Sequence, residues 1–184
     1  MAPVTTSHFR TLATRLTAAV LVCALALAQG PSEYQVKAAF LLNFTKFIEW
    51  PATEFETSNS PMEICILGSD PFGETLDQMV KGETVHGRPV VVRRLKRPPG
   101  PKSCHVLFAS SIDKEMHALT DVSAGVLTVG EGPGFLRDGG IIGFVIENRR
   151  VRFDVNQAAA EKAGLKISSK LLAVARSVEE ARDK

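Results

Sequence analysis

Apolar residues follow helical spacing in one segment near the start of the chain. In residues 33–48, four of them recur at intervals of four, four and three, the pattern of one face of an amphipathic helix. The dipeptide Trp50-Pro51 then ends the helix, because a residue before proline disfavours helical backbone angles. We expect this face to pack on the core of a domain; its members are Val36, Phe40, Phe44 and Phe47.

Short, almost wholly apolar segments follow, and they predict strands covered on both faces of a parallel sheet. Asp70 is placed to cap a helix after the first strand, with Pro71 at the first position of that helix. Another helix is expected at about 112–119, after the third strand. The predicted strands are 63–68, one that begins at 90–92, 104–109 and 126–129.

Two more strands, 141–147 and 150–155, are separated only by Asn148-Arg149 and predict an antiparallel hairpin. Apolar and charged residues alternate along the second strand, so one face is expected in the core and the other in water. Strands alternating with helices predict an α/β fold: a single three-layer domain with a mostly parallel sheet and this hairpin at its C-terminal end.

Two short helices are expected after the hairpin. Asn156 is placed to cap the first, and Gly164 to end it. The second is expected to contain Leu171, Leu172 and Val174 on its apolar side.

Residues 1–28 have the three parts of a secretory signal. Arg10 and Arg15 precede an apolar stretch, and small residues occupy the −3 and −1 positions before a cut after Ala28. We therefore expect a cleaved signal peptide at 1–28 and one exported domain at 29–184.

Two other interpretations of the N-terminal segment stay open. A membrane anchor needs about 20 apolar residues, and the stretch here, 16–27, is shorter. A lipoprotein needs a cysteine, and Cys23 lies in the stretch, but the bulky Val22 precedes it where lipoprotein processing requires a small residue.

Removal of the signal peptide changes the net charge and the number of cysteines that the mature protein keeps. The chain has 22 Lys and Arg against 20 Asp and Glu, and residues 1–28 hold two of the arginines and no acid. The remaining 156 residues are formally neutral, which argues against nucleic acid as a partner. Cys65 and Cys104 remain as an even pair in a compartment where disulfides persist, so we expect a bridge, with two buried free thiols as the alternative.

Residues 88–102 contain six basic residues and no acid. On a strand Arg93 and Arg94 point to opposite faces, so at least one lies outside the core, which suits an edge strand. Two interpretations remain: protection of the edge from unwanted pairing, or docking to an acidic partner or anionic lipid. The candidate partner surface joins this strip to the polar face of the hairpin; its residues are Arg93, Arg94, Lys96, Arg97, Arg150 and Arg152.

Patterns that carry catalysis or bind metals are weak. The chain has no G-x-S-x-G turn and no H-x-x-x-H or C-x-x-C spacing. The Gly-rich segment 130–134 lacks the Gly-Lys-Ser/Thr ending of a phosphate-binding loop and is interpreted as a turn. Glu179 and Glu180 are interpreted as a solvated helix face rather than an acid/base pair. We expect no enzyme activity, no cofactor and no metal.

A set of segments, in order along the chain, carries a resemblance to a known family. The segments are YQVKAAFLLNFTKFIEWP at 34–51, ICILGSDPFGETLD at 64–77, GRPVVVRRL at 87–95, CHVLFASS at 104–111, and 126–175, which includes GGIIGFVIENRRVRFDVN. Together they resemble the YfiR family of bacterial periplasmic proteins.

This resemblance implies a regulator. Proteins of the family bind and inhibit the periplasmic sensor domain of an inner-membrane diguanylate cyclase, which lowers cyclic-di-GMP and limits biofilm formation. Better-studied relatives are themselves restrained by an outer-membrane lipoprotein. Whether this protein forms a homodimer is left open by the sequence. The family also implies a disulfide at Cys65 and Cys104, whereas the C-terminal bridge of some relatives is absent because no cysteine follows Cys104.

Two functions of other classes remain open. One is a periplasmic small-molecule binding protein with its ligand at the carboxyl ends of the parallel strands, where such sheets usually hold ligands. The other is a periplasmic hydrolase that uses serine or carboxylate groups.

Overall fold

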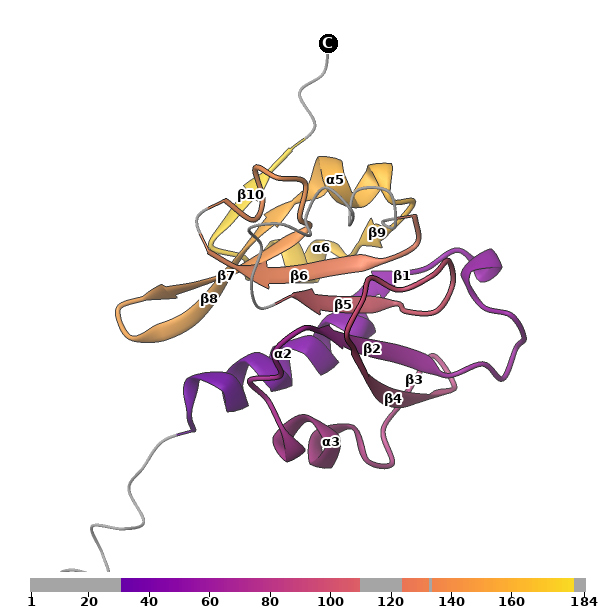
Figure 1. Cartoon of the computed structure of the whole chain (residues 1–184). Coiled ribbons are helices and arrows are strands. Elements are labelled where there is room, and N and C mark those ends of the chain that lie inside the picture. Colours follow the sequence, from indigo (N-terminus) through magenta and orange to yellow (C-terminus); the bar gives the residue numbers. More distant parts are fainter. Residues whose placement is uncertain (1–30, 110–123, 133, 181–184) are drawn as a thin grey trace, which may run out of the picture. The chain divides into compact units, whose positions relative to one another are not determined.

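A curled sheet of eight strands organises the chain after residue 32 in the computed structural model, which describes residues 31–109, 124–132 and 134–180 (Figure 1). Its order is β10-β8-β7-β6-β5-β2-β4-β3. The strands are β2 (Met62–Leu67), β3 (Thr84–Val85), β4 (Arg88–Leu95), β5 (Val106–Ala109), β6 (Leu127–Glu131), β7 (Ile142–Glu147), β8 (Arg150–Asn156) and β10 (Ser177–Glu179).

Five neighbouring strands, β4, β2, β5, β6 and β7, run parallel, and β8 returns antiparallel to β7. This arrangement confirms the predicted α/β class with a mostly parallel sheet and a C-terminal antiparallel hairpin. A separate antiparallel ladder joins β1 (Ile48–Glu49) to β9 (Lys166–Ile167). The predicted helix at 112–119 and the predicted signal at 1–28 lie outside the described residues.

Helix α2 (Glu33–Phe47) buries a wider surface than the sequence predicts, because it contacts α3, α6, β2 and β8. Of the four predicted core residues only Phe44 is fully buried. The rings of Phe40 and Phe44 contact those of Phe144 and Phe153 at centroid distances of 5.1 to 6.0 Å, which fixes the helix on the base of the hairpin. The other buried positions of the helix are Lys37, Ala38, Leu41, Leu42 and Thr45.

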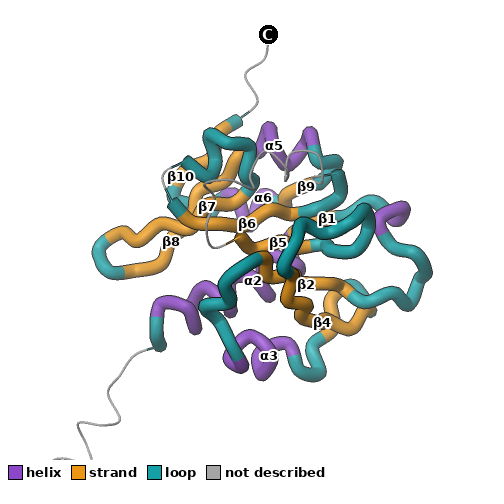
Figure 2. The backbone as a smooth tube through the Cα atoms, viewed as in Figure 1, coloured by secondary structure: helices purple, strands orange, loops and turns teal. Residues whose placement is uncertain are grey.

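The β7–β8 hairpin extends beyond the neighbouring strands (Figure 2). Its turn is the predicted Asn148-Arg149, and both residues have positive φ, 49° and 60°. Positive φ at both central residues is the geometry of a tight type I′ turn, whose twist matches that of the two strands.

Helix α3 (Glu74–Val80) begins later than predicted. The Asp70 carboxylate accepts hydrogen bonds from the backbone N–H groups of Phe72 (2.8 Å) and Gly73 (3.1 Å), as a capping residue does. These bonds close a turn before the helix instead of capping its first residues, so the placement of Pro71 at the first helical position is wrong.

The C-terminal elements agree with prediction in one helix and differ in the next. In α5 (Gln157–Lys162), the Asn156 side chain accepts from the Ala159 N–H at 2.9 Å, which confirms the cap. Helix α6 (Ser169–Leu172) is too short to include Val174, whose side chain is 58% exposed. Glu179 belongs to β10, which pairs with β8, so its assignment to a helix face is wrong.

The disulfide between Cys65 and Cys104, with Cα atoms 5.9 Å apart, lies in a second and smaller core on the other face of the sheet. Phe135 fills this core between two glycines. A Cβ added at Gly130 or Gly140 would lie 2.3 or 2.2 Å from the Phe135 ring, so only glycine fits at either position. Gly130 therefore serves packing. It belongs with Glu131 to β6, so the interpretation of the Gly-rich segment as a turn is wrong for these two residues.

Candidate functional site

Arg93 of β4 lies on the face of the sheet that carries the disulfide. Its Nη1 donates to Glu63 Oε2 at 2.8 Å and to the Ser103 carbonyl at 3.2 Å. The positive charge that the sequence places here is therefore matched by a carboxylate of the neighbouring strand.

Arg94 points to the opposite face, as predicted, and reaches the start of α3. Its Nε donates to Asp70 Oδ2 at 2.7 Å, and its two terminal nitrogens bond both oxygens of Asp77 at 3.0 and 2.7 Å. Burial alone would raise the pKa of Asp70, but the hydrogen bonds from Arg94 and from the backbone N–H groups of Phe72 and Gly73 hold that pKa below its usual value.

Lys96 and Arg97, at the end of the strip, are exposed and make no ion pair with any described residue. Strand β3 pairs only with Arg88 and Pro89, so β4 has no further strand partner on that side within the described part of the chain. The strip thus lies on an open edge, the setting in which basic residues and proline discourage pairing with another chain.

The β7–β8 hairpin continues the apolar face of the sheet past the end of the core. The pair Phe144 and Phe153 is covered by α2, whereas the next pair on the same face, Ile146 and Val151, lies nearer the tip. Ile146 is 52% exposed and Val151 is partly buried. This face therefore presents apolar surface to solvent next to the turn.

The other face of the hairpin is charged. Arg152 lies opposite Val145, and Arg150 opposite Glu147. Both arginines are exposed and make no ion pair with any described residue. The sequence assigned Asp154 to this solvated face, but Asp154 is only 7% exposed, because another part of the chain covers it.

Arg176 is the residue that covers Asp154. Its Nε donates to Asp154 Oδ1 at 2.8 Å, its Nη2 bonds the second oxygen, and its Nη1 lies 3.9 Å from Glu147. The Arg176 guanidinium lowers the pKa of Asp154, and its effect outweighs the opposing effect of burial. An ion pair thus holds the root of the hairpin, whereas Arg150 and Arg152 nearer the tip pair with no carboxylate in the described part of the chain.

The six residues of the predicted partner surface do not lie together. Four belong to the segment from β4 and two to β8, and β2, β5, β6 and β7 lie between these strands. The sequence could not reveal this separation, because it depends on the order of the strands.

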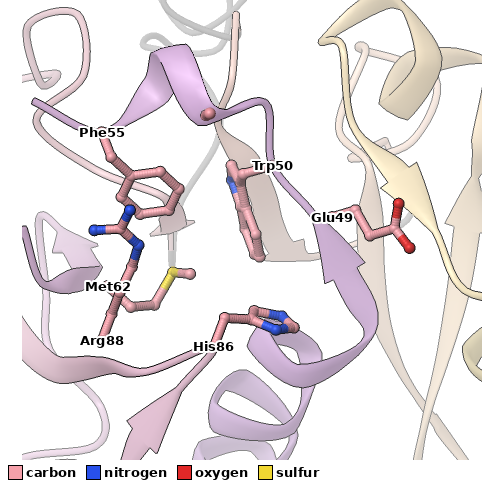
Figure 3. Close-up of a pocket in the computed structure, with 7 residues that line it drawn as sticks. Glu49, Trp50, Phe55, Met62, His86 and Arg88 are labelled. Atoms are coloured by element: carbon pink, nitrogen blue, oxygen red, sulfur yellow. The ribbon is translucent and has the colours of Figure 1, made fainter. Parts of the chain in front are cut away.

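Sequence reasoning missed a pocket at the amino ends of the strands, which we call the amino-edge pocket. It has a volume of about 420 Å³ and includes the first residues of β2 and β4, Met62 and Arg88. The alternative function considered from the sequence, a small-molecule binding protein, placed its ligand at the opposite edge of the sheet, at the carboxyl ends of the strands. The residues of the pocket are Glu49, Trp50, Ala52, Phe55, Met62, His86 and Arg88 (Figure 3).

Phe55 is the centre of a stack beside this pocket. The His105 ring lies parallel to it with a centroid distance of 4.3 Å, and the Arg88 guanidinium carbon lies 3.7 Å from its centroid. Two groups this close to the centre of one ring cannot share a face of it, so they occupy opposite faces. Arg88 is the outer layer and faces the pocket, and such contacts between a guanidinium and an aromatic face are favourable.

His105 is the inner layer and is 3% exposed. Burial lowers its pKa, against the influence of the Glu63 carboxylate, so the ring is neutral at neutral pH. Its Nδ1 accepts from the Glu63 backbone N–H at 3.1 Å. The ring is therefore a structural support for Phe55.

Lys37 of α2 is a second feature that sequence reasoning missed. It is 1% exposed, bonds Glu33 one turn away, and its Nζ lies 3.0 Å from Glu131 Oε2 at the end of β6. Burial alone would lower the pKa of Lys37, but the two carboxylates outweigh it and raise that pKa. The i,i+4 spacing from Glu33 was the only local signal, and it indicates nothing of the contact with Glu131.

Within the described residues, no three His, Cys, Asp or Glu side chains gather in a way that could hold a metal ion. No helix in the same part of the chain combines the length and the apolar character of a membrane span.

A projecting hairpin with exposed arginines and a pocket lined by aromatic and charged groups lie on one α/β domain. Residues 34–176 match the family described as DUF4154, YfiR/HmsC-like, and the chain belongs to this family. The family is regulatory rather than catalytic and acts in the periplasm on diguanylate cyclase signalling.

No curated protein matches the chain. Among solved structures, it is similar to one described as the crystal structure of a conserved domain protein from Vibrio cholerae O1 biovar El Tor strain N16961. The TM-score is 0.46 and the identity 13%, over 80% of this chain and 60% of the other. The chain thus spans less than two thirds of the length of that relative.

Proposed function

We propose that this domain binds the periplasmic sensor domain of an inner-membrane diguanylate cyclase through the β7–β8 hairpin and inhibits it. The exposed tip of the hairpin, with Ile146 on one face and Arg150 and Arg152 on the other, carries the proposal. An apolar anchor flanked by cations is the composition expected at the centre and rim of a protein interface. Inhibition then follows if the domain binds the inactive state of the cyclase more tightly than the active state.

We propose that the other expected partners, an outer-membrane lipoprotein and a second copy of the domain, bind the same hairpin. An outer-membrane lipoprotein that restrains the domain can do so by covering the hairpin, and a homodimer can bury Ile146 in the same way. Light scattering of the purified protein gives its oligomeric state, and competition between lipoprotein and cyclase for the domain tests whether they share the hairpin.

The chain offers a matched pair of variants for the main test. Ile146 and Val174 are both exposed apolar residues, 52% and 58%, but only Ile146 lies on the hairpin. Ile146→Ser should weaken binding of the cyclase sensor domain at least about tenfold in calorimetry, the effect of removing an interface anchor. Val174→Ser should leave binding unchanged, and equal losses in both variants would contradict the hairpin as the contact surface.

Cellular readouts test the inhibition itself. Deletion of the gene should raise cyclic-di-GMP in a strain with an intact partner cyclase, and Ile146→Ser should raise it as well. An unchanged level after deletion would contradict the inhibitory role. We also propose export with cleavage after Ala28, so the mass of the mature protein should correspond to residues 29–184.

A further inference from the structure

We propose that the amino-edge pocket is a binding site for a small planar carboxylate, a site separate from the hairpin. Its volume of about 420 Å³ lies within the range of small-molecule sites and suits one ring-sized ligand. Its position at the amino ends of the strands separates it from the hairpin tip at the far side of the sheet.

The walls of the pocket select a flat ligand. Figure 3 shows Phe55, Arg88 and Met62 on one side and the indole of Trp50 facing them. The indole is held in place because its Nε1 donates to the Gly125 carbonyl at 3.0 Å. Phe55 is held by His105 behind it. Because Arg88 and His105 cover the two faces of Phe55, the free planar wall is the indole of Trp50, and a flat ring can stack on it.

The free donors of Arg88 select a carboxylate. Its Nη1 is occupied by the backbone carbonyls of Thr57 (2.9 Å) and Ser60 (2.8 Å), while Nε and Nη2 bond no described residue. Nε and Nη2 form a fork whose two N–H groups match the two oxygens of a carboxylate. Because stacking and the two carbonyls already fix the guanidinium, a ligand loses little affinity to ordering it.

Glu49 does not compete for Arg88. Its carboxylate belongs to the same pocket but points away from Arg88 (Figure 3). The fork of Arg88 is therefore not neutralised by Glu49 and stays available to an anionic ligand.

The chain contains a single tryptophan, and Trp50 is in the pocket, so its fluorescence reports directly on occupancy. The protein expressed from the full chain is titrated with benzoate, benzamide and benzylamine. We expect benzoate to bind at least about tenfold more tightly than benzamide and benzylamine, the effect of a charge-assisted bidentate bond. Equal affinities for benzoate and benzamide would overturn the assignment.

Variants then test the role of Arg88. Arg88→Gln should weaken benzoate binding about tenfold and leave benzylamine unchanged, and Arg88→Lys should recover only part of the loss because it lacks the fork. Arg97→Gln removes an exposed cation far from the pocket and should change nothing. Loss of benzoate binding in Arg97→Gln as well would show a general charge effect and reject the site. Where Arg88→Gln does not fold, the ligand series on the unmodified protein decides whether the pocket binds carboxylates. Binding of the cyclase is measured separately, so failure of the pocket does not count against the proposed function of the hairpin.

Discussion

Two surfaces of this protein carry arginines at similar density in the sequence and differ completely in the folded state. On β4, Arg93 and Arg94 are matched by Glu63, Asp70 and Asp77. At the hairpin tip, Arg150 and Arg152 face solvent without an ion pair to any described residue. The comparison shows that a basic stretch in a sequence predicts basic surface only where the fold brings no carboxylates to it.

The difference between the two surfaces predicts opposite consequences of charge removal. Arginines with internal partners contribute to folding stability, since their loss leaves carboxylates without a counter-charge. Arginines without internal partners contribute little to stability and are available to a binding partner.

The largest expected effect concerns binding at the hairpin. Reversal of both charges, Arg150→Glu with Arg152→Glu, should weaken the complex with the cyclase sensor domain about 100-fold, because two attractions become repulsions at the interface. Surface plasmon resonance at two salt concentrations measures the loss and its electrostatic origin. The matched reversal of Lys96 and Arg97, which also form no ion pair with a described residue, should change affinity less than about threefold. A larger loss of affinity in this control would contradict the hairpin as the docking surface and would indicate the β4 edge instead.

The next effect concerns stability at β4. Arg94→Ala should lower the free energy of unfolding by about 1–2 kcal/mol, a value moderated by the 42% exposure of the side chain. Arg152→Ala should change it by less than about 0.5 kcal/mol. Urea denaturation of the two variants measures both values, and equal destabilisation would remove the distinction between the surfaces.

The smallest expected effect is a dependence on pH of the stability that is lost in Arg94→Ala. The folded protein holds the pKa of Asp70 below its usual value, so its contribution to stability is complete above about pH 4 and is lost as pH falls through the lowered pKa. The stability gap between the unmodified protein and Arg94→Ala should therefore shrink, by about 1 kcal/mol or less, between pH 5 and strongly acidic pH. Arg152 pairs with no carboxylate among the described residues, so the denaturation curves of Arg152→Ala should show a gap that does not change with pH.

Local signals were sufficient for much of the fold. The hairpin turn at Asn148-Arg149 and the cap at Asn156 depend on the residues themselves and their nearest neighbours, and the structure confirms both. The short ladders were missed because strands such as β1 and β9 have two residues each, too few for a period to show. Strand β10 was mistaken for part of a helix, because only its pairing with β8 identifies it as a strand.

The candidate sites depend on contacts between distant parts of the chain, so the sequence predicted them less well. The amino-edge pocket combines Trp50, Phe55 and Arg88 from three separate segments. Asp154 is buried because Arg176, 22 residues later, lies over it. Neither burial nor partnership could be deduced from local spacing, whereas the exposure of Arg150 and Arg152 followed correctly from the alternation of the strand.

The position of the disulfide determines whether the fragments separate after a protease cuts the chain. Helix α3 and strands β3 and β4 all lie between Cys65 and Cys104, inside one covalent loop. The basic segment after β4 is exposed at Lys96 and Lys102, neither of which precedes a proline, so an enzyme that cuts after basic residues can cleave it there. A single cut there leaves both fragments joined through the bridge and still paired across β2 and β4. The nicked protein therefore remains one molecule with its hairpin in place, and only cleavage combined with reduction can separate the fragments.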